Sequence, residues 1–154
     1  MTIHMMEQRS PEWFAHRVGR VTASRISDLM AQTKSGPGAA RKNYMADLIA
    51  ERLTGEAREG FSNAAMQWGT DTEPQARAAY EFITDQSVTE VGFIDHPRLQ
   101  MAGCSPDGLV GDGGMVEIKC PNTATHIQTL RGKEIDRKYL LQMQWQMICT
   151  GREW

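Results

Sequence analysis

Apolar residues recur at intervals of three and four along much of this chain, which is the spacing that places them on one face of an α-helix. The clearest such stretch is 41–54, which stops at Gly55 and carries a stripe that we expect to lie in the core: Tyr44, Met45, Leu48, Ile49 and Leu53. A last helix is predicted over 135–150, with five residues packing inward: Leu140, Leu141, Met143, Met147 and Ile148.

Capping residues, glycine and proline predict where the other helices begin and end. Ser10 followed by Pro11 begins a short helix, and Gly19 ends it. Further helices are predicted to begin at hydroxyl-bearing caps: 22–31 from Thr22, 62–83 from Ser62 and 123–130 from Thr123. Pro74 must either kink or divide the second of these. The stretch 32–40 is rich in Gly, Pro and Ser and is expected to be a flexible loop.

Strand-like segments occupy the middle of the chain. Residues 88–94 alternate apolar and polar positions, and 99–104 could pair beside them. The stretch 105–121 is predicted to be a β-hairpin, with glycines and Asp112 in its turn and 115–120 as its second arm. Helices therefore come first, then a small sheet, then helices across it, which indicates a mixed α/β domain with helices packed on the sheet.

The predicted hairpin brings three charges to one end. Glu117 and Lys119 are two residues apart and share a face of the second arm, and the turn folds Asp107 back beside Glu117. Two carboxylates can hold Mg2+ through oxygen ligands, and a neighbouring lysine can orient and help deprotonate a metal-bound water. The alternative is a surface salt bridge in a common Asp–Gly turn. The preceding Pro106, the ten-residue step from Asp107 to Glu117 and the apolar opposite face favour the metal site.

A second cluster of polar residues lies near the predicted helix start at 22–24. Arg17, Arg20, Ser24 and Arg25 are close together in the sequence there, and guanidinium groups, a hydroxyl and helix N–H groups all suit a phosphate. The local pattern fits a solvated basic face with ordinary capping at least as well. Glu73, just before the break expected at Pro74, also allows two interpretations: its side chain is either solvated or faces the hairpin.

Composition sets bounds on these readings. The 154 residues suffice for one domain with a core, and 40% of them are hydrophobic. The net charge of -2 provides no global electrostatic attraction to nucleic acid, so any basic surface must be local. The cysteines are three in number and lack CxxC spacing, which argues against a disulfide framework or a zinc site and favours a reducing cytosol. No apolar run resembles a signal peptide or approaches a membrane span.

Short motifs along the chain form one ordered set. They are Gln8-Arg9-Ser10-x-x-Trp13, Arg17-x-Gly19-x-Val21-Thr22-Ala23-Ser24, Trp68-Gly69-x-x-x-Glu73, Cys104-Ser105-Pro106-Asp107-Gly108, Glu117-Ile118-Lys119-Cys120-Pro121 and Gln142-x-Gln144. Pro106-Asp107 with Glu117-Ile118-Lys119 resembles the PD-(D/E)xK nuclease signature, which is short by itself. In order and spacing, the whole set resembles the lambda-type (YqaJ-like) alkaline exonucleases of that superfamily, over nearly the whole chain.

The resemblance implies an α/β fold with a restriction-endonuclease-like core, in which a small mixed β-sheet is flanked by helices. It implies that 1–154 form a single PD-(D/E)xK nuclease domain. In the family a further strand and a C-terminal helix follow the last helix predicted here. We therefore expect a chain that is truncated at its C-terminus or a shortened relative.

The resemblance also implies roles for individual residues. Metal ligation would come from four of them: Glu73, Asp107, Glu117 and the carbonyl of Ile118. Lys119 would activate the nucleophilic water, and Gln142 would orient the site from the last helix. The 5'-phosphate of the degraded strand would be held by three residues: Arg17, Ser24 and Ser105. Met66 would be a wedge that helps to separate the terminal base pair, although a methionine on a helix is normally core.

The function implied is 5'–3' exonucleolytic hydrolysis of linear double-stranded DNA with a 5'-phosphate, which releases mononucleotides and leaves a 3' overhang. Two Mg2+ ions per site are expected, with Mn2+ as a substitute. The implied partners are two further copies in a homotrimeric ring and a single-strand annealing protein, in the cytoplasm of a bacterial host of a phage or prophage. Two rivals are a restriction-like endonuclease of the same superfamily and a noncatalytic DNA-binding or scaffold remnant.

Overall fold

The structure is a computed structural model that describes residues 2–57, 64–132 and 134–154. Its helical elements, in chain order, are α1 (Pro11–Arg17), the 3-10 turn η1 (Ala23–Arg25), α2 (Ile26–Leu29), α3 (Ala39–Thr54), α4 (Ala64–Thr84), α5 (Thr123–Gly132) and α6 (Arg137–Thr150). Its strands are β1 (Ile3–His4), β2 (Val21–Thr22), β3 (Gln32–Thr33), β4 (Gly36–Pro37), β5 (Val88–Thr89), β6 (Phe93–Asp95), β7 (Ala102–Cys104), β8 (Gly108–Val110) and β9 (Gly114–Val116).

The strands form small sheets that are covered by helices. One sheet has the order β1-β6-β7-β2, a second has β5-β8-β9, and β3 pairs only with β4. The β2–β7 pair is parallel and the other pairs are antiparallel. The mixed α/β architecture with a small sheet flanked by helices, predicted from the sequence, is confirmed.

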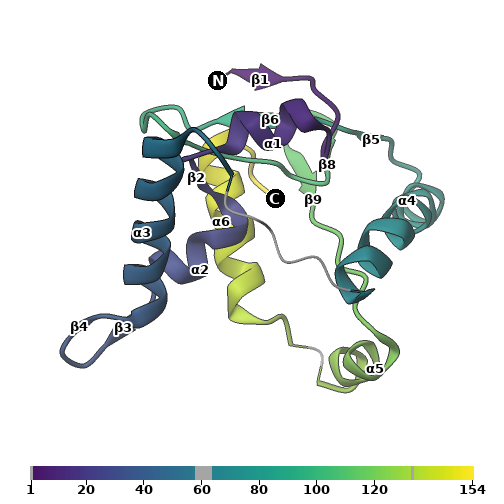
Figure 1. The fold of residues 1–154 in the computed structure, drawn as a ribbon. Coiled ribbons are helices and arrows are strands. Elements are labelled where there is room, and N and C mark those ends of the chain that lie inside the picture. The colour runs from purple at the N-terminus through teal and green to yellow at the C-terminus, as the bar shows by residue number, and fades with distance from the viewer. Residues whose placement is uncertain (1, 58–63, 133) are drawn as a thin grey trace.

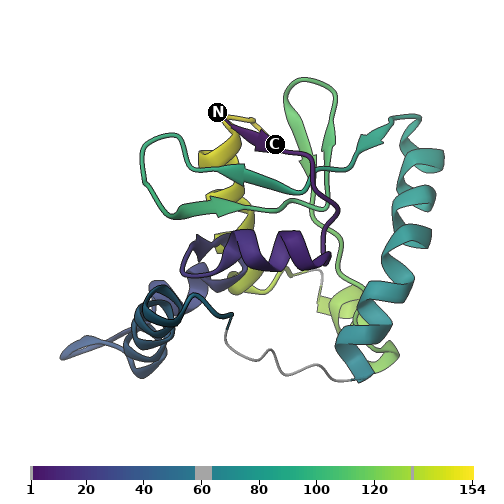
Figure 2. The ribbon, with the colours of Figure 1, turned by 45° about the horizontal axis from the view of Figure 1, so that its top comes forward.

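The helices surround these sheets on different sides. Both views place α3 with the β3–β4 hairpin at one side of the molecule and α4 with α5 at the other (Figures 1 and 2). Helix α6 runs between them and contacts β6, β7, η1 and α2. Trp145 of α6 donates a hydrogen bond of 3.0 Å from its indole N–H to the carbonyl of Gly103 in β7. The last helix is therefore fixed against the sheet that leads into the hairpin.

The core gathers residues from η1, from β6 and the segment before it, from β7 and β8, and from α6. Its buried cluster consists of Ala23, Val91, Ile94, Cys104, Leu109 and Cys149. Trp145, Met115 and Ile3 pack against this cluster from its edges. Cys104 and Cys149 are free thiols that fill core volume.

Several predicted helix ends are confirmed by their hydrogen bonds. The Ser10 hydroxyl accepts from the Trp13 N–H at 3.2 Å and caps α1. Gly55 and Gly151 end α3 and α6 with φ values of 73° and 67°, a conformation that glycine adopts without a Cβ clash. At α5 the prediction was wrong by one residue, because it is Asn122 that accepts the N–H of Thr125. The predicted cap Ser62 lies outside the described residues.

Other expectations about the elements are corrected by the structure. The stretch 32–40 contains the β3–β4 hairpin, whose Gly38 N–H donates to the carbonyl of Ala31 at 2.9 Å. The helix expected from Thr22 opens as the 3-10 turn η1 without a side-chain cap. Helix α4 continues through Pro74 as one element. The segment 88–94 is divided between β5 and β6, which belong to different sheets.

The apolar stripe of 41–54 is mostly not core. Only Tyr44 of α3 is buried, whereas Met45, Ile49 and Leu53 are 58%, 51% and 82% exposed. Helical spacing predicts a shared face but not what covers it, and α3 meets the rest of the described chain chiefly through the short α2. The prediction that Leu140 and Ile148 of α6 pack inward is wrong for the same reason, since both side chains are exposed. Within the described residues, no helix combines the length and apolarity needed to cross a bilayer.

Candidate active site

The β8–β9 hairpin places Asp107 and Glu117 opposite each other. Gly108 pairs with Val116, so the residues just outside this pair meet across the end of the ladder. The Ile118 N–H donates to Asp107 Oδ2 at 2.6 Å, which ties the two arms together at that point. Strand β9 ends at Val116, so the second arm is shorter than the predicted 115–120. The acids therefore lie immediately beyond the strands that position them.

Glu117 is buried and is held by three side-chain donors. Its side chain is 3% exposed. Gln142 Nε2 donates to Oε1 and Gln146 Nε2 donates to Oε2, each at 2.6 Å, while the Lys119 ammonium forms a salt bridge with Oε1. The two glutamines are one helical turn apart on α6, so both amides face the hairpin. Sequence reasoning gave Gln142 a role but gave none to Gln146, although their spacing placed both on one face.

Asp107 has a different environment from Glu117. Burial, followed by the charge of Glu117, raises the pKa of Asp107 to about 7, against the lowering effect of the Ile118 N–H and of Lys119. Burial works to lower the pKa of Lys119, but Glu117 and then Asp107 raise it overall, which keeps the ammonium charged. The site therefore holds two carboxylates close enough to repel and one cation beside them.

Glu73 reaches this region from α4 and is buried there. Arg77 Nη2 donates to its Oε1 at 2.9 Å, and Arg9 donates to its Oε2. The charge of Glu73 also contributes to the raised pKa of Asp107, so Glu73 lies near the hairpin acids. Arg77 follows Glu73 by one helical turn, a spacing that could have revealed the pair. Nothing in the sequence links Arg9 to an acid 64 residues away.

The donor set suits a hard divalent cation, since such ions prefer carboxylate and carbonyl oxygens. A cation between Asp107 and Glu117 would offset the repulsion that raises the pKa of Asp107. Glu73 is less available, because both of its oxygens are bound to guanidinium groups. In the part of the chain that the structure describes, the ligand atoms of Glu73, Asp107 and Glu117 do not all lie within 4.8 Å of one another.

Beside this cluster, Arg17 and Ser105 meet over Trp13. Trp13 Nε1 donates to Ser105 Oγ at 3.0 Å, and Arg17 Nη1 donates to the same oxygen at 3.4 Å. The guanidinium carbon of Arg17 lies 4.0 Å from the centroid of the Trp13 ring. Burial lowers the pKa of Arg17 to about 10, and among the described residues no carboxylate forms an ion pair with it. A partly buried guanidinium group that forms no ion pair within the described chain suits an anion, although the charge of Glu51 acts on it from nearby.

The other members of the predicted basic cluster have partners elsewhere. Arg20 pairs with Asp95 at 3.3 Å. Arg25 pairs with two acids, Asp28 and Asp47. Ser24 is exposed, and its hydroxyl lies 3.4 Å from that of Thr22. Of the two alternatives for this cluster, a phosphate held by all four residues is therefore disfavoured, since acids pair with two of the three guanidinium groups.

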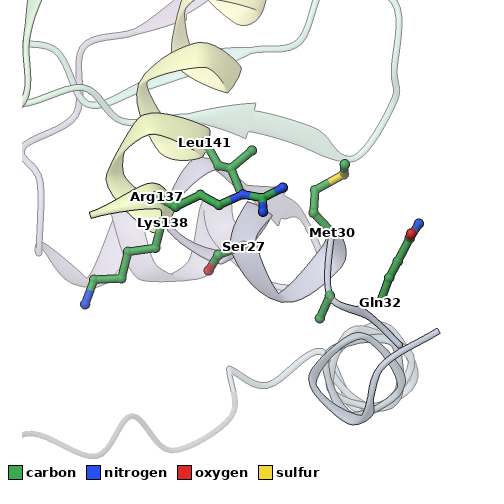
Figure 3. Close-up of a pocket in the computed structure, with 7 residues that line it drawn as sticks. Ser27, Met30, Gln32, Arg137, Lys138 and Leu141 are labelled. Atoms are coloured by element: carbon green, nitrogen blue, oxygen red, sulfur yellow. The ribbon is translucent and has the colours of Figure 1, made fainter. Parts of the chain in front are cut away.

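Two further features lie away from the acids. Met66, the predicted wedge, is exposed on α4. A cavity of about 500 Å3 lies between α2 and α6, and the residues that line it include Ser27, Met30, Arg137 and Lys138. The Arg137 guanidinium extends towards Met30, whereas the Lys138 ammonium points away from it (Figure 3). This cavity shares no residue with the acid cluster.

Comparison with known structures gives the same architecture. An alkaline exonuclease from Laribacter hongkongensis is 56% identical to this chain, covers 94% of it and 71% of its own chain, and superposes with a TM-score of 0.86. A structure of the same exonuclease, LHK-Exo, in complex with dAMP is 57% identical with the same coverage and TM-score. A phage-related exonuclease from Haemophilus somnus 129PT is 14% identical, covers 87% of this chain and 64% of its own, and has a TM-score of 0.64, which shows the fold alone.

The fold, with paired acids and a lysine at the end of its hairpin, defines a protein of the PD-(D/E)xK class. Residues 12–153 match the family described as "YqaJ-like viral recombinase domain". The chain belongs to this family, and the resemblance inferred from its motifs is confirmed. None of the curated proteins matches the chain significantly.

Proposed function

We propose that this protein is a metal-dependent exonuclease that degrades one strand of linear double-stranded DNA in the 5'–3' direction. It releases mononucleotides and leaves a 3' overhang for single-strand annealing. The observation that carries this proposal is the partly buried Asp107–Glu117 pair beside Lys119, at the end of a hairpin in a chain that is 56% identical to an alkaline exonuclease.

The acids would hold two divalent ions, Mg2+ or its substitute Mn2+. Asp107 and Glu117, with the carbonyl of Ile118, would hold the first ion. Glu73 would complete the shell of the second ion once Arg9 or Arg77 releases the Glu73 oxygen to which it donates. When bound, such ions supply charge stabilisation on the phosphate and on the leaving 3'-oxygen. The hydrogen bonds from Gln142 and Gln146 fix the direction of the Glu117 carboxylate.

Lys119 would act on the attacking water. Its ammonium is held by Glu117 Oε1 and is charged at neutral pH, so it would orient the water and stabilise the negative charge that develops on the water oxygen, while the proton of the water passes to solvent. No covalent enzyme intermediate is required, because water is the nucleophile throughout. Gln142 shares Oε1 with Lys119 and thereby sets the position of the ammonium relative to the acids.

The direction of degradation would come from the pocket of Arg17 and Ser105, with Ser24 at its margin. A terminal 5'-phosphate would form the ion pair that Arg17 does not make with any carboxylate of the described residues. Met66 would act as the wedge at the terminal base pair, a role that its exposure permits. We further propose a homotrimeric ring around the DNA and transfer of the product strand to an annealing protein, in the cytoplasm of a bacterium that carries the phage or prophage.

The decisive test is digestion of end-labelled linear duplex by the wild type and by Lys119→Ala, with and without a chelator. We expect Lys119→Ala to lose at least about a hundredfold in rate while its DNA affinity is retained, since the lysine acts on the water rather than on binding. Lys34→Ala, at an exposed position in the β3–β4 turn, serves as the matched control. Equal rates for Lys119→Ala and the wild type would refute the assignment.

The same assay separates the rival activities. Cutting of covalently closed circles would indicate a restriction-like endonuclease. Absence of metal-dependent nucleotide release from any DNA would indicate a noncatalytic binding protein. An exonuclease leaves closed circles intact and degrades linear duplex only when the metal is present.

A further inference from the structure

Two histidines and an aspartate meet on the side of the fold formed by β1, α1 and β6. His4 comes from β1, His16 from α1 and Asp95 from β6, and these elements lie together at the top of Figure 1. Among the residues that the structure describes, these three form the only group of three or more His, Cys, Asp or Glu whose ligand atoms all lie within 4.8 Å of one another. They share no member with the acid cluster of the hairpin.

The distances between the ligand atoms suit a bridging ion. His4 Nε2 lies 2.9 Å from Asp95 Oδ2, and His16 Nε2 lies 3.9 Å from Asp95 Oδ1. The two imidazole centroids are 4.3 Å apart. Zinc bonds to imidazole nitrogen and carboxylate oxygen are about 2.0–2.2 Å long, so one ion reaches two ligand atoms that are up to about 4 Å apart. All three ligand atoms lie within 4.8 Å of one another, which is close to the separation that a shared ion requires.

An unsatisfied nitrogen marks the position of the ion. His16 Nε2 is buried and has no hydrogen-bond partner among the described residues. A buried polar atom of this kind is rare without a water or an ion beside it. His16 Nε2 is also the atom that faces Asp95 in the cluster. A cation at this point would take the free lone pair of His16.

Neighbouring groups hold the carboxylate in place without blocking it. Arg20 Nη1 lies 3.3 Å from Asp95 Oδ1, which leaves Oδ2 to face His4 and the ion. The backbone of Asp95 is fixed as well, because its N–H donates to the carbonyl of Thr2 at 3.0 Å and it pairs with Gly103 across β6–β7. A carboxylate that is oriented by an outer hydrogen bond is the usual arrangement at metal sites.

We propose that His4, His16 and Asp95 form a second metal site, which binds one divalent first-row transition ion, Zn2+ foremost. Two imidazoles and one carboxylate select Zn2+, Co2+ or Ni2+ over Mg2+, which prefers oxygen ligands alone. The ion joins β1, α1 and β6 at a single point and holds the N-terminal strand on the sheet. It is distinct in ligand type and in place from the ions of the hairpin.

The test uses the full chain without added histidines, in an Asp107→Asn/Cys120→Ser background that removes an acid and the partly exposed thiol of the hairpin site. Co2+ is the probe, because its visible d–d absorption reports ligand type, and Zn2+ is then added to displace it. We expect one Co2+ per chain with visible absorption, displacement by Zn2+ and a raised melting temperature with Zn2+. Mg2+ should not displace the Co2+.

Variants assign the ligands. His16→Gln should weaken Co2+ and Zn2+ binding by more than about tenfold, since loss of even an outer partner costs about 10–100-fold in affinity. His126→Gln, at an exposed position on α5, is the matched control and should bind as the parent does. If circular dichroism shows that His16→Gln is unfolded, Asp95→Asn decides instead. Equal affinity for the ligand variants and the control, or absence of Co2+ binding in the background protein, would overturn the proposal.

Discussion

At the scale of single residues, the two central acids show how environment separates identical chemical groups. Glu117 is buried but receives donors from Lys119, Gln142 and Gln146, which compensate its charge. Asp107 has one backbone donor and lies beside that charge, so its pKa rises to about 7. Without metal, Asp107 therefore takes up a proton at a higher pH than an ordinary aspartate does.

This difference predicts a pH dependence of stability in chelator. The pKa of Asp107 rises from 3.8 to about 7 on folding, so the folded state binds the proton more tightly than the unfolded state. The stabilisation that protonated Asp107 contributes is complete below about pH 4 and is lost as the pH rises through about 7. We expect Asp107→Asn to remove this pH-dependent loss of stability, which is on the order of 4 kcal/mol for a pKa rise of this size. Urea denaturation of the wild type and of Asp107→Asn between pH 4 and 8 measures this difference. The same dependence of unfolding free energy on pH in the two proteins would contradict the prediction.

Gln146 is predicted to support Glu117 from a buried position. Gln146→Leu removes the donor to Oε2 and leaves a buried carboxylate oxygen without a partner, which should cost about 1–3 kcal/mol in stability and lower the rate of hydrolysis. Gln144→Leu is the matched control, because Gln144 is exposed on the same helix. Chemical denaturation and the rate on linear duplex are the measurements. Equal effects of the two substitutions would show that Gln146 does not act through Glu117.

At the scale of elements, α1 decides where the candidate anion pocket lies. Ser10 caps this short helix, and Trp13 and Arg17, one turn apart, both face Ser105. The Trp13 indole also donates to the carbonyl of Gly92 at 3.0 Å, which joins α1 to the start of β6. The helix therefore holds a guanidinium group in a place where burial makes an anionic partner favourable.

Arg17→Ala is predicted to distinguish DNA ends. A hydrogen bond to a charged group contributes about 1.5–3 kcal/mol, so loss of Arg17 should slow degradation of 5'-phosphorylated ends by roughly 10–100-fold. Degradation of 5'-hydroxyl ends should change much less. Arg41→Ala, at an exposed position on α3, is the control. If the ratio of the rate on 5'-phosphorylated ends to the rate on 5'-hydroxyl ends is the same in Arg17→Ala as in the wild type, the phosphate-binding role of Arg17 must be dropped from the proposed function.

At the scale of the whole molecule, the last described residues return to the hairpin that carries the acids. The Glu153 N–H donates to the carbonyl of Gly113 at 2.9 Å, and the Met115 N–H donates to that of Trp154 at 2.8 Å. A cavity of about 210 Å3 beside Glu117 is lined in part by Trp154, Leu140 and Met147. The indole lies so close to Gly114 that a Cβ there would be 2.3 Å from a ring carbon.

This contact predicts a coupling between two distant positions. Gly114→Ala should cost about 1 kcal/mol, because the added methyl displaces the Trp154 ring. In a Trp154→Ala background the same substitution should be nearly neutral, since the ring is gone. A double-mutant cycle by urea denaturation gives the coupling energy. Additive effects would show that the ring moves aside without cost.

Local signals in the sequence were sufficient for the hairpin and for several helix ends. Glycines in a turn, a hydroxyl cap before a proline and the opposition of Asp107 and Glu117 all depend on residues close in sequence. Such features are set by backbone sterics and nearby hydrogen bonds, which a short segment carries with it. The α/β order of elements followed from the same local signals. The family motifs then gave a prediction of the fold over the whole chain.

Only the tertiary structure decided which faces are covered and which distant groups meet. The stripe of α3 has helical periodicity, but Leu53 is exposed because nothing described packs on it. The clamp of Arg9 on Glu73 and the approach of His4 and His16 to Asp95 join segments far apart in sequence. Such contacts depend on how the elements pack on one another, and periodicity within an element contains no information about its neighbours.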